Sequence, residues 1–178
     1  HFGVVVNPRP HPELVMREMF RDAIDIFTAM GGGRDELPPA DEYGPAGAAC
    51  QDLEHARQLL REQPLVYPDR VTECLSLVDE LRRSGADPGR ELLCGDFTLA
   101  KSLALAGVGT ALLPRRIARE GTPGLLCRLH ASLPIYEDII YLVFRSDYHR
   151  TRGSVFLKDE LLSCGASMPS VGVRAERT

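Results

Sequence analysis

The order of signals between Cys94 and Arg116 constrains the fold of this chain more than any other stretch. Within it, Asp96 precedes an apolar helical run that ends in Gly-Val-Gly, and a short apolar strand follows and stops at Pro114. Aspartate favours the N-cap of a helix, and glycine favours the position just after its last turn. This order predicts one helix–strand unit of an α/β domain.

Strand and helix signals alternate along the rest of the chain. The expected strands are 2–6, 14–20, 23–29, 65–67, 92–94, 110–113, 125–129 and 139–144, and the expected helices are 51–62, 70–84, 97–106, 115–120 and 155–162. Such alternation predicts an α/β fold with mostly parallel strands. Residues 31–50 are rich in Gly and Pro and predict a mobile surface loop, whereas residues 164–178 predict a frayed tail.

The strongest helix signal lies in residues 70–84. Apolar residues recur there with helical spacing at Val71, Cys74, Leu75, Val78 and Leu81. Leu77 lies off this stripe, so we expect its side chain to be exposed in a monomer.

Composition excludes several classes of function. A chain of 178 residues with 44% hydrophobic content can bury a core. Its net charge of −4 and its lack of Trp argue against a surface that grips a nucleic-acid backbone or stacks bases. The longest near-apolar run, Leu103 to Leu113, is too short to cross a bilayer. The five cysteines are widely spaced, which favours reduced structural thiols in a cytoplasmic protein.

No pattern indicates catalysis, a metal site or a cofactor. The five histidines are scattered, and neither an HExxH nor a GxSxG motif occurs. The pair Gly107 and Gly109 ends a helix and lacks a following Lys-Ser/Thr, so it is not a phosphate loop. One of these glycines should adopt the left-handed conformation, and the other should permit close approach of the strand. We therefore expect no catalytic residues, no metal and no cofactor.

Several segments, taken in order, resemble the effector-binding domain of LysR-type transcriptional regulators. The resemblance spans about residues 1–163. It rests on a strand that runs into a proline-containing loop (2–14), a crossing segment (64–69), a long amphipathic helix (70–84), the sequence AGVGTALLP (106–114), a returning strand (139–144) and the segment 145–152 before a last helix. The ordered set is specific, although AGxG followed by LP also suits solute-binding proteins of the same fold.

This resemblance implies a two-lobed, periplasmic-binding-protein-like (type 2) fold with mixed, mostly parallel sheets. Residues 1–63 and 135–163 would form the first lobe, 64–134 the second lobe and 164–178 the tail. The first lobe is incomplete, because the opening strand–helix–strand of the family is absent. The family's winged helix-turn-helix is also absent, so contact with promoter DNA is expected only through that missing N-terminal domain.

Ligands of open α/β sheets bind beyond the carboxyl ends of strands, where helices begin. Turns of this kind supply the expected effector-binding residues, which are Asn7, Pro8, Tyr67, Asp69, Asp96, Phe97 and Thr98. Simpler roles remain open: Asp69 and Asp96 can cap helices, and Phe97 can belong to the core. Tyr67 needs a polar partner for its phenol.

The arginines at 115, 116, 145, 150 and 152 predict either solvated faces or a rim that faces a carboxylate effector. The resemblance also implies a homodimer or tetramer in which helix 70–84 packs on a partner subunit, with Leu77 at the interface.

The function implied is that of a small-molecule sensor in a cytoplasmic transcriptional regulator. Effector binding would rearrange the lobes and the dimer and so control DNA binding. One alternative is a bilobal solute-binding receptor, which would carry a secretory leader. Another is an enzyme of the same fold class, which would need an acid/base pair in its cleft.

Overall fold

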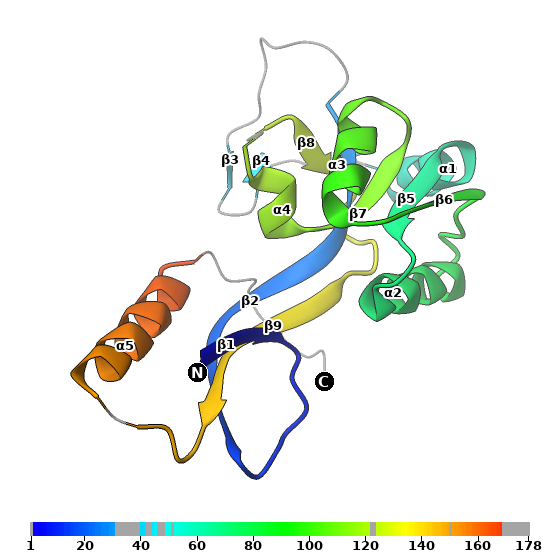
Figure 1. Cartoon of the computed structure of the whole chain (residues 1–178). Helices are drawn as coiled ribbons and strands as arrows, with labels where there is room; N and C mark the ends of the chain where they lie inside the picture. The colour runs from blue at the N-terminus through cyan, green and yellow to red at the C-terminus, as the bar shows by residue number, and fades with distance from the viewer. Residues whose placement is uncertain are drawn as a thin grey trace, which may run out of the picture. The chain divides into compact units, whose positions relative to one another are not determined.

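The computed structural model describes residues 2–30, 40–41, 44–45, 49–50, 52–121, 124–149 and 151–168. The chain divides into two compact units, which are shown in Figure 1. Unit 1 comprises His1–Asp22 and Glu137–Thr178, and unit 2 comprises Ala23–Tyr136. This division assigns residues 23–63 to unit 2, whereas the sequence assigned them to the first lobe. The lobe boundaries themselves stay a prediction.

Unit 1 contains the outer strands and the last helix. β1 (Phe2–Val6) pairs antiparallel with β9 (Tyr136–Arg145), and β9 pairs in turn with β2 (Leu14–Ala29), whose first half belongs to this unit. The rings of Phe2, Phe144 and Tyr148 make edge-to-face contacts with centroids 5.0–5.6 Å apart. These contacts fix the start of β1 to the end of β9.

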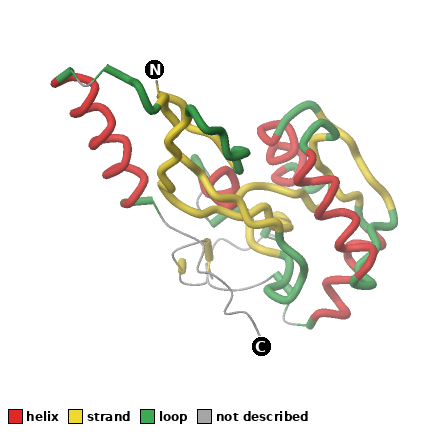
Figure 2. Tube along the Cα trace, turned by 90° about the horizontal axis from the view of Figure 1, so that it is seen from below, coloured by secondary structure: helices red, strands yellow, loops and turns green. Residues whose placement is uncertain are grey.

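The last helix, α5 (Arg152–Ala166), lies beside the strands of unit 1 (Figure 1 and Figure 2). The side chain of Thr151 caps its first turn by accepting from the backbone N–H of Ser154. Near its end, Gly165 is packed so closely on Met19 that an added Cβ would lie 2.7 Å from the Met19 Cβ. The expectation that the tail begins at residue 164 is therefore wrong, because this contact holds the helix to Ala166. Residues 169–178 lie outside the described residues.

Unit 2 contains the parallel strands. β5 (Pro64–Pro68) lies between β6 (Arg90–Cys94) and β7 (Thr110–Pro114) and is parallel to both, while β2 pairs antiparallel with β7 and with the short β8 (Leu126–Arg128). The predicted α/β fold with mixed sheets is confirmed, but the sheets are not mostly parallel: among the described pairings, those of β1 with β9 and of β2 with β7 and β8 are antiparallel. Most of the predicted loop 31–50 falls outside the described residues, which include there a two-stranded ladder of β3 (Ala40–Asp41) and β4 (Gly44–Pro45).

Helices cover both faces of this sheet, because its strands are apolar on both sides. One buried cluster joins Leu65 and Tyr67 of β5 to α1 (Leu53–Glu62) and α2 (Thr72–Arg83). The other joins Val66 of β5 to α3 (Phe97–Leu105) and the short α4 (Arg115–Arg119). The alternation of β5 residues between the two clusters explains why the strand itself is almost entirely buried.

The buried face of α2 differs from the one expected. Leu77 is 2% exposed and belongs to the core, whereas Leu75 is 43% exposed. The expected exposure of Leu77 is wrong because the buried face follows residues 74, 77, 78 and 81, with spacing i, i+3, i+4 and i+7. The apolar stripe predicted from the sequence contained Leu75 instead of Leu77.

The two glycines before β7 have the two roles expected of them. Gly107 follows α3 with φ of +75°, the left-handed conformation that favours glycine. A Cβ on Gly109 would lie 2.1 Å from the carbonyl oxygen of Pro64, so only glycine allows β7 to approach β5 here. Both roles serve the fold.

Candidate functional site

The carboxyl ends of β5 and β6 lie side by side in unit 2. Their last residues, Pro68 and Cys94, are register partners in the parallel ladder. α2 begins four residues after the end of β5, and α3 begins three residues after the end of β6. Five of the seven predicted effector-binding residues belong to this region, which we call the β5–β6 edge (Tyr67, Asp69, Asp96, Phe97 and Thr98).

Asp96 caps α3. Its carboxylate accepts a hydrogen bond of 2.8 Å from the backbone N–H of Leu99, and its side chain is exposed. Burial raises the pKa of the neighbouring Cys94 thiol, and the charges of Asp96 and Asp69 raise it further. Both carboxylates therefore lie near the same thiol, and the edge carries negative charge.

Asp69 does not cap α2, so the capping role considered for it is wrong. The N-cap residue of α2 is Val71, which makes no side-chain hydrogen bond to the helix. The chain first forms a turn in which the N–H of Val71 donates to the carbonyl of Pro68, and this turn lies between the end of β5 and the first residue of α2. The first turn of α2 is thus left without a side-chain cap, and Asp69 is exposed beside it.

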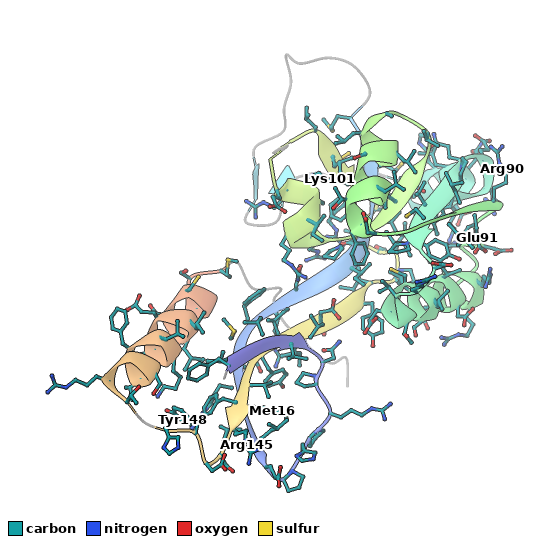
Figure 3. All side chains as sticks on the ribbon, viewed as in Figure 1. Met16, Arg90, Glu91, Lys101, Arg145 and Tyr148 are labelled. Atoms are coloured by element: carbon teal, nitrogen blue, oxygen red, sulfur yellow. The ribbon has the colours of Figure 1, made fainter. Side chains whose placement is uncertain are left out.

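Tyr67 is turned into the core. Its side chain is 3% exposed, and its hydroxyl donates a hydrogen bond to the carboxylate of Glu91, which also pairs with Arg82. Figure 3 labels Glu91, which belongs to β6, the edge strand of the sheet in unit 2. Burial and the negative charge of Glu91 both raise the pKa of the Tyr67 phenol. The Tyr67 phenol therefore has the polar partner expected from the sequence, and this partner is the Glu91 side chain of the same unit.

Phe97 and Thr98 face different surroundings although they are adjacent. Phe97 is half-buried and packs against both core clusters of unit 2. Thr98 is exposed in the first turn of α3, and its carbonyl accepts a hydrogen bond from the Ser102 hydroxyl. Of the two, Thr98 is the exposed residue at the β5–β6 edge.

Asn7 and Pro8 belong to unit 1. Asn7 adopts φ of +44°, and its side chain donates to Asp138 Oδ1 at 2.8 Å while accepting from the backbone N–H of Ile139 at 2.9 Å. The N–H of Asn7 also donates to the carbonyl of Ile139. These bonds hold Asn7 against β9 where β1 ends. Asparagine suits this position because it tolerates the left-handed conformation better than most residues.

A buried ion cluster in unit 2 was not anticipated. Asp25 is fully buried in β2, and its Oδ2 accepts from Nη2 and Nε of Arg115 at 2.9 and 3.2 Å. Arg128 of β8 contacts the same oxygen as an ion pair. The expectation that Arg115 lies on a solvated face is wrong: it is 7% exposed because this pairing holds it in the interior. The sequence predicted a strand over 23–29, and no local signal identified the distant arginines that pair with Asp25.

Other classes of site find no support in the described ranges. Within them, no group of three or more His, Cys, Asp or Glu side chains is arranged to hold a metal ion. None of the helices that can be described has the length and apolar character needed to span a membrane. The five cysteines are free thiols, and burial raises the pKa of Cys127 to about 11.

Comparison with known proteins agrees with this architecture. The family described as the LysR substrate binding domain matches residues 1–161. No curated protein sequence matches the chain significantly.

Three solved structures illustrate the similarity of fold. The regulatory domain of CcmR from Synechocystis PCC6803, in complex with 2-PG, is 15% identical, with a TM-score of 0.62 over 95% of this chain and 75% of that one. The regulatory domain of HypT from Salmonella typhimurium is 19% identical, with a TM-score of 0.64 over 93% of this chain and 73% of that one. Full-length CbnR, complexed with its target DNA, is 17% identical, with a TM-score of 0.57 over 93% of this chain and 52% of that one.

With its α/β units, its mixed sheet and a family match over nearly its whole length, the chain belongs to the LysR substrate binding domain family, the effector-binding part of LysR-type transcriptional regulators.

Proposed function

We propose that this chain senses a small-molecule effector at the β5–β6 edge of unit 2 and thereby controls a transcriptional regulator. The family is regulatory and not catalytic. The observation that carries the proposal is the first turn of α2, which has no side-chain cap and begins beside the exposed Asp69.

An uncapped helix start favours an anionic group. The first N–H groups of a helix have no partner within the helix, and its N-terminus carries partial positive charge. The carboxylate of Asp96 already caps the first turn of α3, whereas no side-chain carboxylate caps the first turn of α2. A second HypT structure has a bromide ion bound, and the CcmR domain binds 2-PG. These relatives support an anionic effector without identifying it.

The negative charge of the β5–β6 edge limits the net charge that a ligand bound there can carry. Asp69 and Asp96 would repel a molecule that carries several negative charges. A monocarboxylate with a second, hydrogen-bond-donating group fits better, because that group can donate to Asp69 while the carboxylate accepts from the first turn of α2. Amino acids and hydroxy acids have this combination.

A thermal-shift series on the chain tests this proposal. We expect a saturable rise in Tm with one class among amino acids, hydroxy acids and simple carboxylates, and no rise with their amides. A ligand that binds only the native state adds about 2.7 kcal/mol at a hundredfold excess over its Kd. Asp69→Asn and Thr98→Val should reduce the rise, whereas Ser76→Ala, an exposed hydroxyl of α2 away from the edge, should not. An unchanged response in both edge variants would contradict the location.

In the intact regulator, effector binding would change the arrangement of subunits on promoter DNA. Such coupling requires different effector affinities in the two arrangements. A homodimer or tetramer in the cytoplasm, with DNA bound by a separate domain, accords with what the family does. Because Leu77 is buried, we infer that any partner contact through α2 uses the exposed Leu75.

A further inference from the structure

Unit 1 holds a cavity that the β5–β6 edge does not involve. Its volume is about 620 Å³, and it lies against β2, the end of β9 and α5. Figure 3 labels Tyr148, one of the lining residues, in the segment that leads from β9 to α5. This volume falls within the range of roughly 300–1,000 Å³ that is usual for small-molecule sites.

One wall of the cavity is apolar. Val155 and Leu162 lie two turns apart on the half-buried face of α5, and Val15 projects from β2 on the opposite side. Phe144 and Tyr148 close the wall with an edge-to-face contact of 5.0 Å between ring centroids. Such a wall suits an aliphatic or aromatic body.

The remaining lining carries an excess of positive charge. Arg17 has no ion-pair partner among the residues that the structure describes. Lys158 is paired at 3.1 Å with Asp159, which is not one of the residues that line the cavity. Glu18, the one carboxylate of the lining, is bound by Arg21 at 2.9 Å. An entering anion would therefore meet Arg17 and a Lys158 that Asp159 partly neutralises, and the one carboxylate among the described lining residues, Glu18, is already paired.

We propose that this cavity is a second ligand site, which binds a monocarboxylate with an apolar body. The carboxylate accepts hydrogen bonds from Arg17 and Lys158, and the body packs against Val155, Leu162 and the Phe144 ring. Charge-assisted bonds to a guanidinium are among the stronger polar contacts available to a protein. The site lies wholly within unit 1, so it goes beyond the proposed function and does not depend on it.

Calorimetric titration of the chain with 3-phenylpropanoate tests this site. We expect saturable binding of one molecule per chain, and binding about tenfold weaker for the neutral 3-phenylpropanamide, a difference that corresponds to one charge-assisted contact. Arg17→Gln should lower the affinity for the carboxylate by a similar factor. Arg9→Gln, which removes another exposed arginine of unit 1 that is outside the cavity lining, should leave it unchanged. Val155→Trp, which fills the cavity, should abolish binding.

Three outcomes would overturn the proposal: no saturable binding at millimolar concentrations, equal binding of the amide, or unchanged affinity in Arg17→Gln. Asp69→Asn separates the two sites. Loss of binding in Asp69→Asn, with full binding in Arg17→Gln, would place the probe at the β5–β6 edge and refute the cavity while supporting the proposed function. The reverse pattern would establish the cavity and leave the edge to its own test.

Discussion

Asp96 and Asp69 follow neighbouring parallel strands, yet only one of them stabilises a helix. Asp96 caps α3 directly, whereas an intervening turn separates Asp69 from the start of α2. An exposed carboxylate such as Asp69, which has no hydrogen-bond partner among the described residues, is the better candidate for a ligand contact. The sequence predicts a helix cap at both residues equally, because the length of the turn before a helix depends on packing that the sequence does not show.

We expect Asp96→Ala to lower the free energy of unfolding by about 1 kcal/mol, the usual cost of losing an N-cap. Asp69→Ala, a change of the same type at an exposed site, should alter it by less than about 0.5 kcal/mol. Urea denaturation followed by circular dichroism measures both. Equal losses would show that Asp69 has a structural role that its surroundings do not reveal.

The Asp25 cluster pairs charges from three elements of unit 2, the strands β2 and β8 and the helix α4. Removal of one partner from a buried ion pair leaves the other charge without compensation, which costs roughly 3–5 kcal/mol. Asp25→Ala should therefore destabilise the chain by an amount in this range, since Arg115 is almost fully buried. Asp79→Ala removes an exposed pair with Arg82 and should cost less than about 1 kcal/mol. Similar midpoints for the two variants in urea would contradict the assigned role of Asp25.

α2 illustrates how a correct helix prediction can still give the wrong buried face. Its apolar residues fit two overlapping stripes, one through Leu75 and one through Leu77, and the neighbouring helix and strand decide between them. In the structure Leu77 packs in the cluster formed with α1 and β5. The exposed Leu75 then becomes the apolar residue available to another subunit.

Leu77→Ala should destabilise the chain by about 2–5 kcal/mol, because it leaves a cavity in the core. Leu75→Ala should change stability by less than about 0.5 kcal/mol. In the intact regulator, Leu75→Glu should weaken self-association measured by light scattering. If Leu75→Glu leaves the oligomeric state unchanged, α2 does not form the partner contact.

The two units were predictable from the sequence to different degrees. Local signals located most strands and helices within a few residues, and the Gly107–Gly109 pair predicted both its left-handed turn and its close approach. Contacts between distant segments were not predictable. The pairing of Asp25 with Arg115, the bond from Tyr67 to Glu91 and the packing of Gly165 on Met19 each join residues from separate elements.

The candidate site shows the same limit. The principle that ligands bind beyond parallel strands located the β5–β6 edge, and five predicted residues belong to it. Only the structure distinguishes their surroundings: Tyr67 is buried, Phe97 is half-buried, Asp96 is engaged as a cap, and Asp69 and Thr98 are exposed. Asn7 carries a strand-ending role that its left-handed conformation explains.

The central claim is that an effector binds at the β5–β6 edge. The most direct test is an NMR titration of the ¹⁵N-labelled chain with the ligand that gives the largest thermal shift. We predict saturable changes in the amide signals of Asp69, Thr72 and Thr98, at the same concentrations that raise Tm. Changes confined to residues of unit 1, with the signals of the edge unaffected at saturation, would contradict the claim.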